Sequence, residues 1–492
     1  MSISLGTNLN SVPASQKQTL STNYLDLSSA DNAGWGQQYL PDLMEKEAEV
    51  FGPRTISGFL SQVGAEESMT ADQVIWSEQS RLHLSYTGNM SNANEFTVTK
   101  DIDGNVSGDG FTPANHGVRL SDTVLISNAN GVFKALVNGV TNAAITVAPY
   151  DGVAIAQLTT ADASTLLVYG SEYAKGTAYY TASATAAAET RGANEPAFKT
   201  FTNKPIIMKD YYEVSGSDAS RIGWVETSSE QGANGYMWYL KAESDTRARF
   251  NDYIEMSMLE SVRGSGTNAV DTFLGSAQAG NDTLVGTQGL FDAIEDRGHV
   301  TTGVTGVNAS TDLAEFDAIL AEFDKQGAIE ENMMFVNRAT SLAMDDMLAS
   351  MNSYGAGGTS YGVFNNSEDM ALNLGFSGFR RGSYDFYKSD FRYLNDLATR
   401  GGINAANAAN AIRGVIVPAG TSTVYDQSLG SNLKRPFLHV RYRASQTDDR
   451  RMKSWVTGSV GAATTALDAM QLHFLTERCL ITQGANNFML MK

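Results

Sequence analysis

The spacing of apolar and polar positions is most regular over residues 234–262. Apolar side chains recur there at three- and four-residue steps, which is the spacing of one helix face. A helix of about 28 residues would be roughly 42 Å long, well above the average of about three turns. We therefore expect one very long helix, with a stripe formed by Tyr236, Tyr239, Leu240, Phe250, Ile254, Met258 and Val262.

Short β-branched runs follow one another before this helix. They cover residues 96–99, 122–127, 132–137 and 144–148, and the turn sequences DGN, NANG and NG separate them. Short strands divided by Asn-Gly and Asp-Gly turns are typical of antiparallel hairpins. The pattern predicts a compact β-rich module at 91–158.

Two extended stretches flank the predicted module. Residues 71–89 have the composition of a strand, and residues 165–228 alternate strand signals with the polar run AETRGANEPAFKTFTNKP. A structureless loop of that length is uncommon in a compact domain. We expect residues 165–228 to form an extended two-stranded hairpin.

Helices and strands alternate in the second half of the chain. Ser310 is expected to cap a helix that ends before Gly327, and Asn337 to cap a second helix after the apolar run MMFV. We further expect a helix at about 462–478, and an N-terminal helix over 41–52. The fold class is therefore α+β, with further strands near 361–364, 384–387, 412–417, 437–442 and 487–491.

Composition and charge restrict the classes of function. The 492-residue chain is 42% hydrophobic and 18% charged, below the usual quarter of charged residues, and small polar residues take their place. A net charge of −19 argues against binding nucleic acid by neutralising phosphates. The single cysteine, Cys479, allows no disulfide within the chain and is expected to be a small buried apolar residue. We expect neither a signal peptide nor a membrane span.

Three short stretches resemble ligand sites but fit simpler structures better. The run DIDGN at 101–105 has glycine at position 4, whereas an EF-hand needs it at position 6, so we expect a tight turn. The run GSEYAKGT at 170–177 reverses the Gly-Lys order of a phosphate loop, so we expect a turn at a strand end. The basic cluster at 434–453 is interrupted by Asp448 and Asp449, and we expect paired charges at a subunit contact.

The sequence GTQGLFDAIEDRGHV at 286–300 resembles a metal site more closely. On a short helix, Asp292, Glu295 and Asp296 would lie on one side. His299 follows Asp296 at the carboxylate-x-x-His spacing of di-metal bundle proteins.

A plain elbow explains the same stretch better. Gly298 would end the helix and turn His299 off its face, while Leu290, Phe291 and Ile294 would bury the opposite side. No second carboxylate-His motif completes a di-metal centre. We expect no catalytic, cofactor-binding or metal-binding residues.

The polar residues 1–34 would be unfolded alone, so we expect another molecule to hold them. This arm, the extended excursion and the long helix occur in the order found in the HK97-like major capsid proteins of tailed bacteriophages, which the chain resembles. More narrowly, it is similar to the capsid proteins of crAss-like podoviruses over nearly its whole length. The similar runs are GVRLSDTVLISNANG, GTQGLFDAIEDRG, MMFVNRATSLAMDDML and TERCLITQGANNFML.

The resemblance implies an HK97-like capsid fold and its division into segments. An extended loop, the E-loop, would lie over a neighbouring subunit, and its residues Arg191, Lys199, Phe201 and Lys204 would be assembly contacts. The segments would be an N-terminal arm at 1–64, a lead-in at 65–90, the inserted β module at 91–158, the E-loop at 159–228, a peripheral domain with a spine helix at 229–300, an axial domain at 301–432 and a C-terminal return at 433–492.

The implied function is structural and not enzymatic. The protein would assemble into hexamers and pentamers of an icosahedral shell around double-stranded DNA, in the cytoplasm of a host bacterium. Its partners would be further copies of itself, a portal protein, a separate scaffolding protein, decoration or head-fibre proteins, and DNA bound without sequence specificity. No cofactor and no membrane are implied.

Two other functions remain open from the sequence. A tail tube, sheath or surface-layer subunit would share the arms and the small-residue composition but would build an open array. A glycan-active enzyme would need two carboxylates facing one cleft, and sequence alone does not exclude such a pair among 54 acidic residues.

Overall fold

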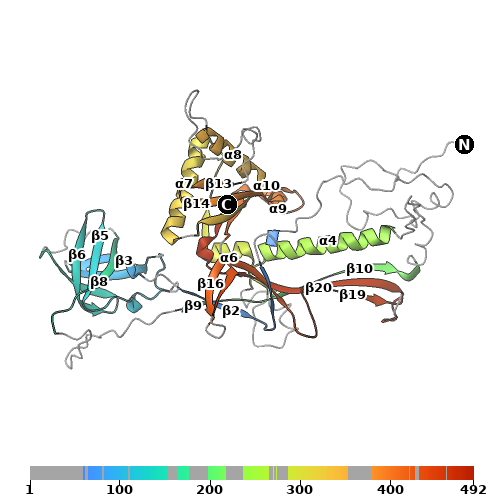
Figure 1. The fold of residues 1–492 in the computed structure, drawn as a ribbon, viewed down its shortest axis with the longest axis horizontal. Coiled ribbons are helices and arrows are strands. Elements are labelled where there is room, and N and C mark those ends of the chain that lie inside the picture. Colours follow the sequence, from blue (N-terminus) through green and yellow to red (C-terminus); the bar gives the residue numbers. More distant parts are fainter. Residues whose placement is uncertain are drawn as a thin grey trace. The chain divides into compact units, whose positions relative to one another are not determined.

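The structure is a computed structural model (Figure 1). The predicted helix at 41–52, the N-terminal arm up to residue 58 and the predicted strand at 361–364 lie outside the residues that it describes. Those residues are 59–60, 65–79, 83–92, 94–102, 104–108, 111–152, 163–176, 198–217, 237–264, 270, 273, 286–327, 329–352, 378–419, 421–426, 431–460 and 463–492.

The chain divides into two compact units. The larger contains Met1–Trp76 and Thr202–Lys492, and the smaller contains Ser77–Phe201. Strands β2 (Val74–Gln79) and β9 (Phe198–Asn203) pair where the chain passes between the units.

The smaller unit is a closed six-stranded barrel. Its core includes Phe96, Ile126, Ile145 and Leu166, all fully buried, and its strands follow the order β3-β4-β7-β6-β5-β8. Closure removes the unpaired edges that an open sheet would leave. The strands are β3 (Ser85–Asn92), β4 (Glu95–Asp101), β5 (Asp122–Asn128), β6 (Gly131–Thr141), β7 (Ala144–Pro149) and β8 (Ser164–Ser171).

The barrel extends beyond the predicted module at 91–158 at both ends. The pairing of β3 with β8 closes the barrel. Most of β3 and all of β8 lie outside residues 91–158. The four strands predicted inside the module are confirmed. So are both turns: the Asp101 carboxylate accepts from the Asn105 N–H at 2.8 Å, and β8 ends before a turn at Lys175 and Gly176.

In the larger unit, a five-stranded sheet carries the long helix α4 (Met237–Glu260). Figure 1 shows α4 lying along β10, β20 and β19. Phe250 and Ile254 of α4 pack on Leu472 and Phe474 of β20. The sheet follows the order β1-β18-β20-β10, and β19 also pairs with β20. Its strands are β1 (Ala65–Met69), β10 (Ile206–Ser215), β18 (Leu438–Arg443), β19 (Lys453–Gly458) and β20 (Ala469–Thr482).

The predicted long helix is confirmed in position, and α4 has 24 residues and ends at Glu260, two residues before the predicted end. Its apolar residues Phe250, Ile254 and Met258 are buried as expected. Val262 lies beyond the end of α4 and is exposed, so its place in the stripe was wrong. The side chains at the start of α4 lie outside the description.

Two other predictions for this unit were wrong. The described residues of the segment 462–478 contain the start of β20 and no helix. Its apolar run is almost entirely buried, and periodicity cannot distinguish such a strand from a buried helix. The stretch 165–228 is no hairpin in its described parts, because β8 belongs to the barrel, β9 pairs with β2 and β10 pairs with β20. Residues 177–197 lie outside the description.

A second, six-stranded sheet in the larger unit follows the order β11-β21-β15-β12-β14-β13. Helices α7 (Ala309–Gln326) and α8 (Arg338–Asn352) share a core with it that includes Phe316, Phe386 and Ile416. The strands are β11 (His299–Thr301), β12 (Glu331–Val336), β13 (Gly378–Arg381), β14 (Tyr384–Asp390), β15 (Gly414–Pro418) and β21 (Met489–Met491).

Most helix ends in this region follow the predicted capping. The Asn337 side chain accepts from the Thr340 N–H at 2.8 Å, and Gly327 ends α7 in the left-handed conformation. The cap of α7 is Asn308 and not Ser310, because the Asn308 side chain reaches the Thr311 N–H. The remaining elements are α6 (Leu290–Arg297), α9 (Arg392–Asn395), α10 (Arg400–Ala406), β16 (Thr421–Asp426) and β17 (Ser431–Pro436).

The fold is mixed α+β, with strands predominating. Within the described part of the chain, no helix combines the length and the apolar character that crossing a bilayer requires.

Candidate functional site

The acidic residues of α6 do not surround a common point. Glu295 and Asp296 are exposed; Glu295 pairs with Lys492 at 2.5 Å, and Asp296 lies near Arg297. Burial raises the pKa of Asp292, and the charges of Asp296 and Glu295 add to that shift. Among the described residues, no group of three His, Cys, Asp or Glu side chains could hold a metal ion.

His299 lies off the helix that carries these acids. The Gly298 N–H donates to the Ile294 carbonyl at 2.7 Å and ends α6, as predicted. His299 then begins β11, and its ring packs edge-on against Phe323 with centroids 6.5 Å apart. Burial lowers the pKa of His299. The stretch is a helical turn that leads into a strand.

A buried asparagine joins this elbow to the strands around it. The side chain of Asn203, 1% exposed, donates to the carbonyls of Gln288 at 3.0 Å and Leu480 at 2.6 Å. Its oxygen accepts from the N–H groups of Gln288 and Lys204 and from the Thr287 hydroxyl. We call this set of bonds the Asn203 clasp. The sequence gives only a weak signal for it: a lone Asn between two strand patterns.

A second polar link joins α4 to the short helices α9 and α10. Glu260, at the end of α4, accepts from the Tyr393 hydroxyl at 2.8 Å and from the Arg400 guanidinium at 2.9 Å. Burial and the bond to Glu260 raise the pKa of Tyr393, so its hydroxyl stays protonated and donates. No motif in the sequence indicates this contact.

Three of the four predicted assembly residues lie in β9 or directly after it. Phe201 is half-buried in β9, and Lys204 is half-buried in the turn between β9 and β10. Lys199 is also in β9, but its side chain is outside the description, as is the whole of Arg191. The structure thus brings Phe201 and Lys204 close to the Asn203 clasp, and their part in assembly stays a prediction.

The basic cluster at 434–453 is paired inside the chain wherever its side chains are described. Glu477, 4% exposed, lies 2.7 Å from Arg443 and 3.0 Å from Arg450. The predicted pairing of charges is confirmed, with partners in the same chain, and the subunit contact at this cluster stays a prediction. The further pairs are Arg441–Glu67, Arg451–Glu66 and Lys453–Asp448.

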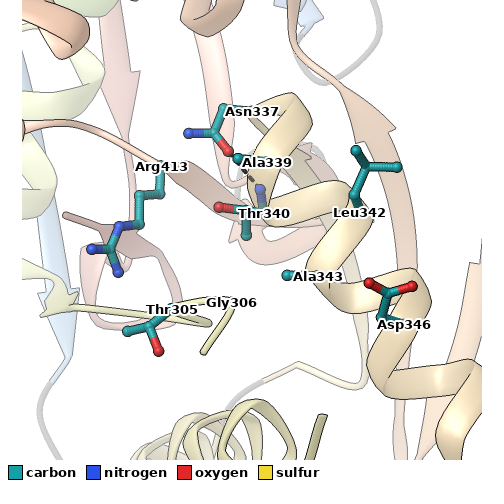
Figure 2. Close-up of a pocket in the computed structure, with 9 residues that line it drawn as sticks. All are labelled: Thr305, Gly306, Asn337, Ala339, Thr340, Leu342, Ala343, Asp346 and Arg413. Atoms are coloured by element: carbon teal, nitrogen blue, oxygen red, sulfur yellow. Dashed lines mark hydrogen bonds between the residues drawn. The ribbon is translucent and has the colours of Figure 1, made fainter. Parts of the chain in front are cut away.

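A pocket of about 310 Å³ lies against the first turns of α8 (Figure 2). Arg413 on one side and Asp346 on the other are its ionisable groups, and Leu342 and Ala343 supply apolar surface. The Arg413 guanidinium donates to the Thr302 carbonyl at 2.9 Å. One carboxylate lines this pocket, whereas glycoside hydrolysis requires a facing pair, so the pocket offers the glycan-active alternative no support.

No protein-family model matches the sequence, and no curated protein does. Solved phage structures, including the following three, are similar in fold at low identity. A structure of Microbacterium phage Oxtober96 is 8% identical, with 92% of this chain and 95% of that chain covered and a TM-score of 0.36. The capsid of the cyanophage P-SCSP1u is 6% identical, with 93% of this chain and 94% of that chain covered and a TM-score of 0.36. The mature capsid of bacteriophage PhiM1 is 10% identical, with 63% of this chain and 78% of that chain covered and a TM-score of 0.30.

Proposed function

We propose that this chain is the major capsid protein of a tailed bacteriophage. It would assemble into hexamers and pentamers of an icosahedral shell that encloses double-stranded DNA, and its place would be the virion. A portal protein, a separate scaffolding protein and decoration or head-fibre proteins would be its other partners. DNA would be held without sequence-specific contacts.

The observation that carries this proposal is the layering of the five-stranded sheet. The 24 residues of α4 span roughly 36 Å, and the 14 residues of β20 span roughly 47 Å. Helix α4 covers one face of this long sheet. On the other face, Ile207, Tyr211 and Trp455 are exposed. A thin two-layer plate that leaves apolar side chains open needs neighbours to cover it.

Exposed apolar side chains in the second sheet region support the same proposal. Val307, Leu342, Leu397 and Ile403 lie on or beside the helices α7, α8, α9 and α10, and all are exposed. Contiguous exposed apolar patches mark protein–protein interaction sites, and these four side chains would contribute to such patches. In a closed symmetric assembly, neighbouring copies of the same protein would cover these side chains through many contacts that are each weak.

The sequence resemblance supplies the roles that we assign to the parts. The five-stranded sheet with α4 would be the peripheral domain, with α4 as its spine helix. The six-stranded sheet with α7 and α8 would be the axial domain around the symmetry axes, and the barrel would be an insertion. Residues 177–197 would belong to the E-loop, with Arg191, Lys199, Phe201 and Lys204 as contacts to a neighbouring subunit.

The acidic character of the chain suits a container for DNA. A net charge of −19 repels a polyanion, which would let a genome slide along the inner wall during packaging. Arg441, Arg443, Arg450 and Arg451 are already paired with carboxylates of the same chain, so they would not hold phosphates tightly.

Electron microscopy of the purified protein, alone and together with candidate scaffolding proteins, tests the proposal. We expect closed icosahedral shells or capsomers with five- and six-fold symmetry. Tubes or flat sheets would favour a tail or surface-layer subunit instead. A monomer under every condition would contradict any assembly function.

A further inference from the structure

Three aromatic rings form a ridge across the open face of the five-stranded sheet. Tyr211 of β10 stacks on His473 of β20 with centroids 6.1 Å apart. On the other side of His473, Trp455 of β19 stacks at 5.2 Å, with an angle of 17° between the rings. We call Tyr211, His473 and Trp455 the aromatic ridge. It runs perpendicular to the strands, on the face opposite α4.

The ridge is both exposed and held in place. Tyr211 is 57% exposed and Trp455 is 37% exposed, so both side chains are accessible to a partner. His473 is fixed from both sides by the two rings, and its Nε2 lies 2.7 Å from the Thr457 hydroxyl. Rings that are already ordered lose little entropy when they are buried by a partner. Tyr and Trp are also the side chains enriched at the energetic centres of interfaces.

The flanks of the ridge differ in charge. Lys209 and Lys453 lie on one side of the ridge, because both are paired with Leu475, two residues along β20 from His473. Lys453 pairs with Asp448, whereas Lys209 is exposed and has no acidic partner among the described residues. Glu213 and Gln471 lie on the opposite flank, joined at 2.6 Å. An acidic protein surface would complement the Lys209 side.

We propose that the aromatic ridge is an anchor that inserts into the surface of a second copy of this chain. The proposal rests on the capsid function proposed above and names one interface of that assembly. A further copy, with its net charge of −19, supplies the acidic surface that Lys209 favours. Glu213 on the flank of the ridge and the net charge of −19 make the same face unfavourable for nucleic acid.

Cysteine labelling tests this contact directly. The only native cysteine, Cys479, is buried, and burial raises the pKa of its thiol to about 12, so it reacts slowly. In Glu213→Cys, the new thiol lies next to Tyr211. We expect a maleimide to label it at least about tenfold more slowly in assembled than in unassembled protein, because the core of an interface excludes water.

A second variant measures how much the ridge contributes. Trp455→Thr should raise the protein concentration needed for half-maximal assembly by roughly tenfold, as loss of an interface anchor does. The matched control is Tyr387→Thr, since Tyr387 is exposed on a strand but takes no part in the ridge. Circular dichroism of the unassembled proteins shows whether each variant remains folded.

The outcomes separate this proposal from the capsid proposal. Shells that form while Glu213→Cys stays fully reactive would overturn the ridge contact and leave the capsid function standing. A chain that never assembles would overturn both. Protection that arises only after double-stranded DNA is added would mean that nucleic acid occupies the ridge, which also overturns the contact with a second copy.

Discussion

Asn203 illustrates, at the scale of one residue, how a single buried amide joins segments distant in the chain. Its side chain bonds to the elbow at Thr287 and Gln288 and to β20 at Leu480. A buried donor or acceptor left without its partner costs about 1–3 kcal/mol. The clasp therefore contributes to stability mainly because its removal would leave several buried backbone groups without a hydrogen-bond partner.

Replacing this amide by an apolar side chain should weaken the larger unit. We expect Asn203→Leu to lower the free energy of unfolding by about 2–4 kcal/mol, since both carbonyls and the Gln288 N–H lose a partner. Urea denaturation measures the change. Asn410→Ala, at an exposed position, is the control and should change stability by less than about 0.5 kcal/mol. Equal effects for both variants would contradict the role of the clasp.

His299 should make stability depend on pH. Burial lowers its pKa below the ordinary value of 6.5, so the unfolded chain binds the proton more readily than the folded chain. The stability that depends on neutral His299 is fully present above the pKa of His299 in the unfolded chain. It is lost as the pH falls through the pKa of His299 in the folded chain. We expect His299→Gln to lose less stability than the wild type between about pH 7.5 and pH 5.

Unfolding midpoints in urea at the two pH values measure this difference. Asn410 is exposed and has no titratable side chain, so Asn410→Ala should keep the pH dependence of the wild type. A His299→Gln protein that loses as much stability as the wild type would show that other groups cause the acid sensitivity.

At the scale of elements, the join between α6 and β11 leaves no room for a side chain. A Cβ at Gly298 would lie 2.8 Å from the Ala485 carbonyl oxygen and 2.8 Å from a methyl group of Ile294. We expect Gly298→Ala to cost about 1–3 kcal/mol, the usual cost of overpacking. Thermal denaturation measures the loss.

Gly378→Ala is the matched control for this prediction. A Cβ at Gly378 would meet its nearest neighbours at 3.5 and 3.6 Å, which is ordinary contact. The control should therefore unfold within a few degrees of the wild type. If Gly298→Ala were equally mild, the elbow would be looser than the contacts at Ala485 and Ile294 indicate.

The error at β20 has a physical cause at this scale as well. Residues 472–481 are almost all buried: Leu472 and Phe474 lie on the face that α4 covers, and Leu475 and Cys479 are buried on the opposite face. A strand buried on both faces loses the alternation that identifies a half-buried strand. The same sequence therefore fits a buried helix until its neighbours are known.

At the scale of the whole molecule, the barrel should be a folding unit of its own. It has a separate core, which includes Phe96 and Ile145, and all its strands lie within Ser77–Phe201. We expect a fragment of residues 77–201 to unfold in one cooperative transition with a β-type circular dichroism spectrum. Phe96→Ala should destabilise that fragment by about 3–5 kcal/mol. A gradual transition without a baseline would contradict an independent barrel.

The sequence by itself determined the features that depend on near neighbours in the chain. The long helix, the barrel's hairpins, the caps at Asn337 and Gly327 and the stop at Gly298 all follow from spacing and side-chain type within a few residues. The exclusion of a disulfide framework follows from a single cysteine. Local hydrogen bonds and backbone preferences do not need the rest of the fold.

Tertiary structure decided which distant segments meet. Closure of the barrel by β3 and β8, the strand conformation of β20, the Asn203 clasp and the aromatic ridge each join residues tens to hundreds of positions apart. Their energies come from burial and pairing between segments, which no local pattern encodes. Tertiary structure also decided which face of the five-stranded sheet α4 leaves uncovered, because the exposure of a side chain depends on how the whole molecule packs.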